Sequence, residues 1–144
     1  MKVNVKKLHP AATLPTYATD GAACFDIRTI EAGKVPARGV CRFRTGLAFE
    51  VPAGHVLKVY SRSGHGFNHG LRLSNVVGIV DSDYRGEVII GITNDSATSF
   101  EFEPGDRIAQ GMILLLPQVE LVEADSLSET ARGTGGFGST GVKC

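Results

Sequence analysis

Glycine is the residue that most constrains this chain, because 18 of its 144 residues are glycine, whereas glycine usually makes up about 7% of a soluble protein. A glycine inside a helix destabilises that helix by about 1 kcal/mol relative to alanine, so this abundance excludes a helix bundle. Glycine is favoured instead at turns, at β-bulges and where the backbone comes close to a ligand. The composition therefore predicts a chain that changes direction often.

Short stretches of alternating or β-branched apolar residues follow one another along the sequence and end at glycine, proline or other turn formers. Short strands with a turn signal about every 8 to 12 residues are typical of an all-β sandwich or barrel. One short helix is expected within residues 61–70, with Ser61 as its N-cap. The strands that the pattern predicts are 47–51, 56–60, 88–93, 100–103 and 119–123.

Charge and end sequences narrow the classes of function. Fifteen basic residues balance fifteen acidic ones, which argues against electrostatic binding to bulk nucleic acid or to a membrane surface. The N-terminus lacks the apolar stretch of a signal peptide, and the strongly apolar run 112–116 is too short to span a bilayer. We therefore expect a soluble, cytoplasmic protein with no nucleic-acid or membrane partner. The odd cysteine count argues against a disulfide framework, and Cys24, Cys41 and Cys144 are expected to be reduced, the first two buried.

The C-terminal segment 132–144 is rich in glycine and carries one aromatic residue, Phe137. Its freed backbone amides, together with Arg132 and two hydroxyl side chains, could cradle a phosphate. Composition alone fits a disordered tail as well, but a lone aromatic side chain in such a segment suits a lid over a flat ring. We expect one domain over 1–131 and a mobile arm over 132–144 that orders when it binds something.

The segment 76–88 places two carboxylates between apolar stretches. Its pattern predicts a β-hairpin with Asp81 and Asp83 near the bend, and Asp residues are common turn formers without any function. The adjacent Tyr84 and Arg85 strengthen a functional interpretation. One of the two carboxylates could serve as a general base if a water and an electrophile came within ~3 Å.

Two weaker signals lie elsewhere. Residues 60–64 place Arg62 and two hydroxyls at a strand end, which suits an anion but equally suits a capped turn. His65 and His69 have the i,i+4 spacing of helical zinc ligands, but a third ligand is missing nearby and the flanking glycines weaken the helix. A structural role is the more common explanation for each.

Taken together, these segments resemble the trimeric dUTPase family. Five motifs of that family occur in order, and the resemblance extends over roughly residues 14–141. Cys24 departs from the family pattern, which usually has glycine at that position. The motifs match residues 20–27, 61–64, 78–86, 105–110 and 132–141.

The resemblance implies a distorted jelly-roll, or β-clip, of short strands and a homotrimer whose active sites are shared between subunits. It implies hydrolysis of dUTP to dUMP and pyrophosphate with Mg²⁺ on the triphosphate, which limits uracil in DNA and supplies dUMP for dTMP synthesis. In this reading Asp81 deprotonates the attacking water, Tyr84 stacks under the deoxyribose, Phe137 covers the uracil, and Asp26 acts on the metal through water. The implied substrate-binding positions are Arg62, Ser63, Gly64, Asn75, Gly78, Ile79, Val80, Tyr84, Ile89, Gln110, Arg132, Phe137, Gly138, Ser139 and Thr140.

Two alternatives within reach of the sequence remain open. A dCTP deaminase, or a bifunctional deaminase and dUTPase, belongs to the same fold, but the Asp-x-Asp-Tyr of motif three and the glycine-rich arm favour a dUTPase. A dUTP-responsive regulatory binding protein is a different class, against which the complete set of motifs argues. A lectin-like sandwich fits the composition but leaves the ordered motifs unexplained.

Overall fold

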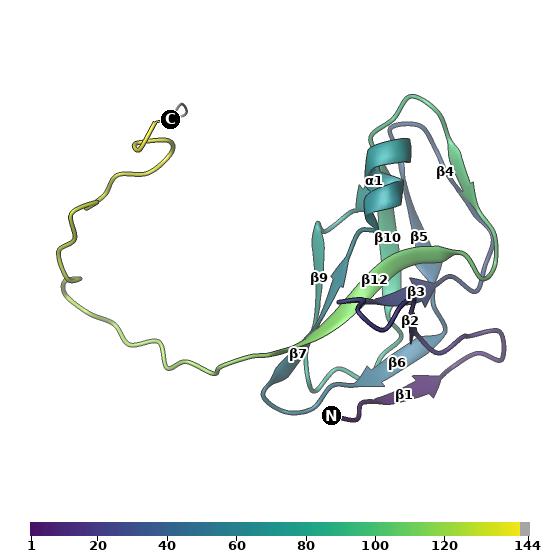
Figure 1. The fold of residues 1–144 in the computed structure, drawn as a ribbon, viewed down its shortest axis with the longest axis horizontal. Coiled ribbons are helices and arrows are strands. Elements are labelled where there is room, and N and C mark those ends of the chain that lie inside the picture. The colour runs from purple at the N-terminus through teal and green to yellow at the C-terminus, as the bar shows by residue number, and fades with distance from the viewer. Residues whose placement is uncertain (142–144) are drawn as a thin grey trace.

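The computed structural model describes residues 1–141, so Cys144 and the end of the arm lie outside the described residues. The described chain forms short antiparallel strands and one helix (Figure 1). The helix is α1 (Ser63–His69). The strands are β1 (Asn4–Lys7), β2 (Thr16–Tyr17), β3 (Phe25–Arg28), β4 (Gly33–Val35), β5 (Val40–Arg44), β6 (Leu47–Glu50), β7 (His55–Tyr60), β8 (Leu71–Leu73), β9 (Val77–Val80), β10 (Ile89–Asn94), β11 (Phe100–Phe102) and β12 (Arg107–Leu115).

Two sheets carry the functional motifs. The larger one has the order β2-β3-β12-β7-β9, and the smaller one has the order β5-β10-β8. Strands β1 and β6 form a separate pair, as do β4 and β11. The long strand β12 joins the first and second motifs, because Gln110 lies opposite Asp26 on β3 and opposite Tyr60 on β7.

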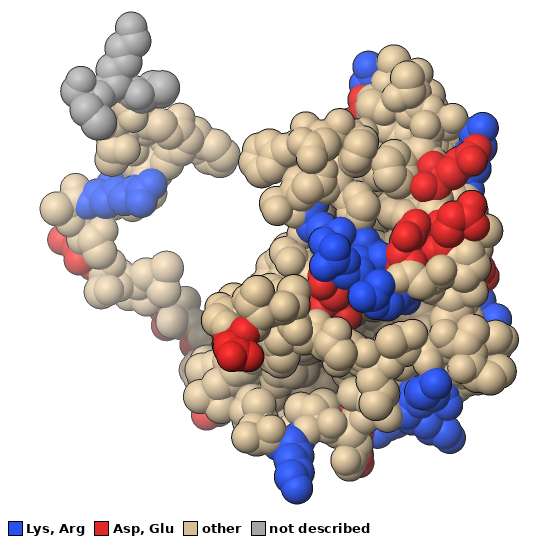
Figure 2. All heavy atoms as spheres, turned by 45° about the vertical axis from the view of Figure 1, so that its right-hand side comes forward, with Lys and Arg blue, Asp and Glu red and all other residues tan. Residues whose placement is uncertain are grey.

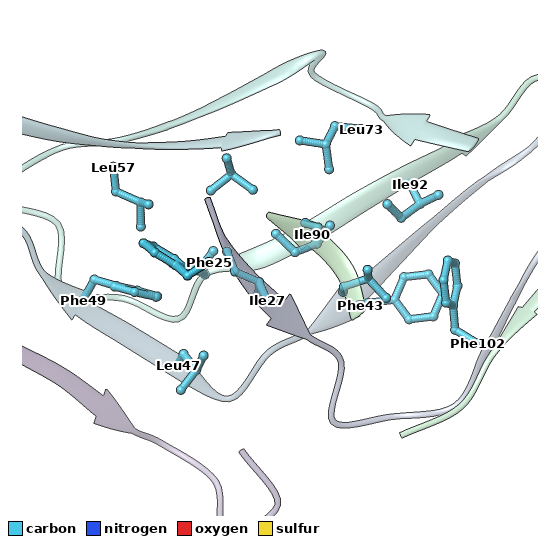
Figure 3. Packing of buried hydrophobic residues seen from close by; sticks show 14 of the residues in the cluster. Phe25, Ile27, Phe43, Leu47, Phe49, Leu57, Leu73, Ile90, Ile92 and Phe102 are labelled. Carbon is cyan, nitrogen blue, oxygen red and sulfur yellow. The ribbon is translucent and has the colours of Figure 1, made fainter. Parts of the chain in front are cut away.

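The core lies between these sheets and is made of aliphatic and phenylalanine side chains (Figure 3). Phe43 and Phe102 meet edge to face with ring centroids 5.2 Å apart, and Ile27 and Leu57 are fully buried. Phenylalanine pairs of this kind bury a large apolar area in a chain that has no tryptophan. The core holds both sheets in fixed positions, and the candidate site lies where their edges meet.

Most of the predicted strands are confirmed, since 47–51, 56–60, 88–93 and 100–103 correspond to β6, β7, β10 and β11. The fifth, 119–123, is wrong: that segment contains no strand, and Leu121 is 92% exposed. A strand needs a neighbouring edge to pair with. Leu116 still donates its N–H to the Gly54 carbonyl at 2.7 Å, and after it the chain leads away from the sheets (Figure 1).

The predicted helix exists, but its predicted cap is wrong. Arg62 is the N-cap residue, and it makes no side-chain capping bond. Ser61 instead accepts the Leu73 N–H on its Oγ at 2.9 Å, which ties the start of the helical segment to β8. The helix ends at Gly70, whose φ of 66° places it in the left-handed conformation that glycine adopts most easily.

Two smaller expectations can be compared with the described residues. Cys24 and Cys41 are half-buried rather than buried, so they lie near the surface of the sheets. Within residues 1–141, the chain offers no helix of the length and apolarity that crossing a membrane requires.

Candidate active site

A cavity of about 430 Å³ opens between β9 and β10. The predicted hairpin is wrong here, because β9 pairs with β7 in the larger sheet and β10 pairs with β5 and β8 in the smaller one. The two strands are consecutive in sequence but belong to different sheets, and the opening between them forms the pocket. Below, this cavity is called the base pocket; it is lined by Arg42, Val59, Leu73, Ser74, Asn75, Gly78, Ile79, Val80, Asp81, Tyr84, Glu87, Val88, Ile89, Ile90 and Gly91.

Strand edges supply the polar groups of the base pocket. In the described residues β9 is the edge strand of its sheet. On β10, the neighbour β8 pairs with Ile92–Asn94, and the ladder stops short of Ile89 and Ile90. Each edge therefore presents backbone N–H and C=O groups that sheet pairing leaves available. Such groups can form hydrogen bonds with the polar edge of a planar ring, as they would with a neighbouring strand.

A strained turn brings Asn75 to this pocket. The Val76 N–H donates to the Leu73 carbonyl at 3.1 Å, and the Val77 N–H donates to the Asn75 carbonyl at 2.6 Å. Val76 has a φ of 63°, which is unusual for a β-branched residue. Backbone strain of this kind persists where the surrounding structure fixes the local conformation, often at binding sites. A Cβ added to Gly78 would lie 3.7 Å from the Asn75 amide nitrogen, so the two residues are neighbours in the pocket.

The loop from Asp81 to Val88 forms one side of the base pocket. Asp81 lines the pocket, whereas Asp83 does not. This difference favours Asp81 between the two carboxylates that the sequence offered. The Tyr84 ring also lines the pocket, is 45% exposed, and donates its hydroxyl to the Glu87 carbonyl at 3.1 Å.

A second hollow, of about 340 Å³, gathers the first, second and fourth motifs. Asp26 accepts from Arg62 Nε at 3.2 Å on one carboxylate oxygen and from Arg107 Nη1 at 3.1 Å on the other. Two guanidinium groups face one carboxylate, so one positive charge remains for an anion. Below, this is called the anion hollow; it is lined by Ala18, Ala22, Ala23, Cys24, Asp26, Arg62, Ser63, Gly64, Arg107 and Gln110.

Motif two reaches the anion hollow through the start of α1. Ser63 and Gly64 are the first residues of the helix, where backbone N–H groups have no acceptor within the helix itself. Gln110 points toward them from β12 and donates to the Ser61 carbonyl at 3.1 Å. The hollow therefore combines a net positive charge with polar groups from three segments.

His65 supports the anion hollow from behind rather than binding a metal with His69. Its Nε2 lies 2.8 Å from the Arg107 carbonyl, and its ring packs against Phe102 with centroids 5.2 Å apart. Burial is the main reason that the pKa of His65 lies below its ordinary value, and the Arg62 charge acts in the same direction. In residues 1–141, no group of three or more potential metal-binding side chains is found.

Cys24 replaces the glycine expected in motif one and lies beside the Asp26 carboxylate. Burial, and to a smaller degree the charge of Asp26, raises the pKa of the Cys24 thiol. A raised pKa keeps the thiol protonated and weakly nucleophilic at neutral pH. This departure from the family pattern thus adds a neutral side chain to the anion hollow.

The arm residues that the sequence singled out do not reach either hollow. Arg132 donates from Nε to the Gly135 carbonyl at 2.7 Å, and the Ser139 N–H donates to the Gly136 carbonyl at 3.0 Å. Phe137 is fully exposed. Gly138 and Thr140 lie in the same local turns, and Figure 1 shows this part of the chain well away from the sheets.

Among the polar residues at these sites, four escaped the sequence analysis: Arg42, Ser74, Glu87 and Arg107. Arg107 stood inside motif four, but its role depends on Asp26, which is 81 positions away in the chain. Ser74 follows β8, and its N–H donates to the Gly91 carbonyl at 2.9 Å. The local sequence carries no signal for such contacts, because they depend on strand register.

The surface shows why net neutrality does not prevent anion binding. On the face in Figure 2, basic and acidic side chains lie next to one another instead of separating by sign. Such a surface has no broad field for a polyanion. A small anion can still be held where arginines converge, as they do at Arg62 and Arg107.

Comparisons with known proteins agree with this geometry. The profile of the family described as dUTPase matches residues 11–141. The deoxyuridine 5'-triphosphate nucleotidohydrolase of Wolinella succinogenes is 48% identical, and the match covers 98% of this chain and 95% of that protein. The protein of the same name from Helicobacter pylori is 41% identical over 99% of this chain and 98% of its own length. A Staphylococcus bacteriophage 80alpha dUTPase G164S mutant with dUpNHpp superimposes with a TM-score of 0.91 at 27% identity, over 98% of this chain and 99% of that one. Five ordered motifs, two hollows built from them, and full-length similarity at this level lead to one conclusion: this chain belongs to the dUTPase family.

Proposed function

We propose that this protein is a dUTP diphosphatase, which hydrolyses dUTP to dUMP and pyrophosphate. The observation that carries the proposal is the base pocket, where two strand edges face each other and Asp81 lies on the lining. The curated relatives are named for this reaction along their full length. The phage structure with dUpNHpp adds a fold match to a protein that holds a nucleotide analogue.

Recognition of uracil follows from the backbone edges. Asn75, Gly78, Ile79, Val80 and Ile89 surround a space that suits a single planar ring. Cytosine presents a different donor and acceptor pattern, and a mismatch would leave buried backbone groups unpaired, which costs about 1–3 kcal/mol each. Thymine carries one extra methyl group. Strand backbone is more rigid than side chains, so a pocket lined by backbone excludes that methyl group more effectively. Tyr84 would lie against the deoxyribose and leave no room for a 2′-hydroxyl.

The catalytic step assigned to Asp81 is a single displacement. Its carboxylate accepts a proton from a water molecule while the water oxygen bonds to the α-phosphorus. The bond between that phosphorus and the bridging oxygen breaks, and the electron pair leaves with pyrophosphate. Phosphoryl transfer depends mainly on positioning and charge neutralisation, so one base and a set of cations suffice.

We infer a homotrimer with shared sites, and the separation of the two hollows supports this assignment. The base pocket and the anion hollow have no lining residue in common. A nucleotide in the base pocket needs cations for its phosphates, and Arg62, Ser63, Gly64 and Gln110 of a neighbouring subunit would supply them. The arm, with Arg132, Phe137, Gly138, Ser139 and Thr140, would close over a neighbouring site in the same way. This assigns 1–131 to the catalytic domain and 132–144 to the closing arm.

The residues of the anion hollow fit Mg²⁺ held through water. Mg²⁺ is usually bound by one or two carboxylates, several waters and substrate phosphates rather than by a full protein cage. Both oxygens of Asp26 already accept hydrogen bonds from arginines, which suits contact through a water molecule better than direct ligation. When bound, the ion supplies charge neutralisation to the triphosphate. Asp26 would orient that water while its contacts with Arg62 and Arg107 hold the carboxylate in place.

The substrate assigned here is a soluble nucleotide, which is also the reason to place the enzyme in the cytoplasm. The reaction would limit uracil in DNA and supply dUMP for dTMP synthesis. The arm would exclude water when it closes and release products when it opens.

A pyrophosphate-release assay with dUTP, dTTP, dCTP and UTP tests the proposal directly. We expect release from dUTP at a rate at least about 100-fold above the other three, the discrimination that a site with matched hydrogen bonds can reach. Ammonia is measured in the dCTP reaction. Ammonia release, or equal rates with dUTP and dTTP, would contradict the assignment.

A further inference from the structure

An ion pair fastens the far end of the loop that carries Asp81 and Tyr84, and both of its residues, Arg44 and Glu87, lie outside the five motifs. Arg44, at the end of β5, contacts Glu87 Oε2 through both Nε and Nη2, each at 3.1 Å. The other carboxylate oxygen of Glu87 accepts the Gly46 N–H at 2.8 Å. The Glu87 side chain is only 16% exposed, so both oxygens are committed inside the protein.

The arginine of this pair is itself held through its backbone. The Arg44 N–H donates to Glu31 Oε1 at 2.8 Å, and the Arg44 carbonyl accepts the Ile30 N–H at 3.0 Å. These contacts connect Arg44 to the segment after β3. The guanidinium group therefore projects from a fixed support.

The neighbouring residues extend the same attachment. The Val88 N–H donates to the Leu47 carbonyl at 2.9 Å, and the Val88 carbonyl accepts the Thr45 hydroxyl at 2.6 Å. Thr45 and Val88 are both buried. The end of the loop is thus joined to residues 44–47, whereas its middle is joined to β6 only by the exposed pair of Arg85 and Glu50 at 3.8 Å, a kind of contact that contributes little.

Tyr84 depends on this attachment for its position. Its hydroxyl donates to the carbonyl of Glu87 itself at 3.1 Å. Its ring lies over Gly86, where an added Cβ would be 2.4 Å from the hydroxyl oxygen and 2.6 Å from Cζ. The ring is half-exposed, so core packing does not fix it. The Gly86 backbone beneath the ring and the hydrogen bond from the Tyr84 hydroxyl to Glu87 set the position of the ring.

We propose that the Arg44–Glu87 pair is a positioning device that holds Tyr84 in place and thereby sets the discrimination between deoxyribose and ribose triphosphates. The inference rests on the proposed function, in which the Tyr84 ring lies against the sugar. Excluding one hydroxyl oxygen requires a ring that does not shift. When Glu87 loses Arg44, its side chain is held by the Gly46 N–H alone, so the Glu87 carbonyl is held less firmly and the ring can shift far enough to admit the 2′-hydroxyl.

The test compares kcat/KM for dUTP and for UTP in Glu87→Gln, which removes the charge but keeps the shape. We expect the ratio of the two values to fall about tenfold, the size of effect that one small group has in a pocket. The fall should come mainly from a lower KM for UTP. Glu101→Gln is the matched control: it removes a carboxylate paired with Lys34 at 3.2 Å, away from both hollows, and should leave the ratio unchanged.

A double-mutant cycle separates positioning from a general loss of stability. Tyr84→Phe keeps the ring and removes its hydrogen bond to Glu87, so it should lower the ratio by a similar factor. Because both changes act on the same contact, Glu87→Gln combined with Tyr84→Phe should lower the ratio no further than either alone. Effects that multiply, or a Glu87→Gln enzyme with the wild-type ratio, would overturn the inference.

Two further measurements keep the outcomes distinct. If Glu87→Gln lowers the melting temperature too far for assay, Arg44→Lys keeps the charge and loses the two-point contact; it should lower the ratio as well, and an unchanged ratio counts against the device. Wild-type enzyme is assayed first with dUTP. A wild type that does not hydrolyse dUTP refutes the proposed function, whereas an active wild type with variants of unchanged ratio refutes only the role of the pair.

Discussion

The base pocket and the C-terminal segment after β12 differ in what orders them. The pocket is formed by strands of two sheets whose other side is the core. The C-terminal segment makes local turns, and its apolar side chains are exposed, including Leu121 at 92% and Leu127 at 89%. The pocket is therefore stabilised by folding itself. The segment has apolar surface left to bury, and a ligand or a second chain is the partner it requires.

This difference suggests separate tasks for the two regions: the base pocket would recognise the nucleotide, and the arm would close over it. The base pocket is formed by the fold itself, so in the proposed function it binds and selects nucleotide before the arm acts. The arm would contribute after binding, when contacts with the nucleotide offset the cost of ordering it. A change in the base pocket and a change in the arm should therefore alter the activity in different ways that can be measured separately.

Asp81→Asn is expected to have the largest effect, because it removes the base and leaves the pocket in place. We expect kcat for dUTP to fall by at least about 1,000-fold, within the range for loss of a general base. The dissociation constant for dUTP, measured by calorimetry, should stay within about threefold of wild type. Asp83→Asn serves as the control because Asp83 does not line the pocket. Turnover near the wild-type rate in Asp81→Asn would contradict the assigned role.

Deleting residues 132–144 tests the proposed contribution of the C-terminal arm. We expect kcat/KM to fall about 100-fold, a size typical of losing preorganised groups around the phosphates. The melting temperature should not change, because the described arm residues make their contacts with one another. Phe137→Ala within the full chain gives the contribution of the ring alone. A fully active truncated enzyme would show that closure plays no part.

Mixing these two variants probes whether the parts come from different subunits. Subunits of Asp81→Asn and of the truncated chain are co-refolded in equal amounts. A shared site can then combine an intact Asp81 from one chain with an arm from another, and activity should rise several-fold above the sum of the separate variants. Native mass spectrometry measures whether the mixed oligomers of the proposed trimer form. If they form and activity does not rise, each site belongs to a single subunit.

The smallest expected effect concerns the pH dependence of stability, and it comes from His65 in α1, within the folded domain rather than in the arm. The pKa of His65 lies below its ordinary value in the folded protein, so the unfolded chain binds more protons as pH falls through about 6.5. The free energy of unfolding should decrease below that pH, by less than about 1 kcal/mol per pH unit, and His65→Leu should reduce this slope. His69→Leu removes a ring 6.4 Å away whose charge also lowers the pKa of His65, so it should reduce the slope less than His65→Leu does.

The truncated chain completes this measurement. Chemical denaturation at several pH values should give the same slope with and without residues 132–144. A slope that disappears with the arm would mean that the arm packs on the sheets, against the comparison drawn above.

The local sequence was enough to predict the strands and motifs whose signals lie within a few neighbouring residues. The strands that end in Pro104 and Gly105 or at Pro52 were predicted from turn residues and alternation, and the motif residues from their order. Which strands pair with one another could not be predicted from the local sequence. Segments 76–80 and 89–93 are close in sequence, which favours a hairpin, but β7 and β5 pair with them instead. Those partners are fixed by burial of whole strands in the core.

Two errors and one omission have related causes. Ser61 has the side chain of a good cap, but its hydroxyl accepts from Leu73, twelve residues away. Residues 119–123 have strand-forming side chains but no adjacent edge within the described chain. The pair of Arg44 and Glu87 was not predicted, because strand β5 brings together two ordinary charged residues that are distant in sequence. In each case the outcome depends on tertiary contacts that the local sequence does not contain.

The available edges of β9 and β10 have a consequence for how such an enzyme can evolve. Hydrogen-bond groups that belong to the main chain are the same for every amino acid except proline. Mutations along these strands change the walls of the base pocket but leave the pattern of donors and acceptors intact. Selectivity for one base can therefore be inherited with the sheet topology itself, and the side chains around it are free to diverge.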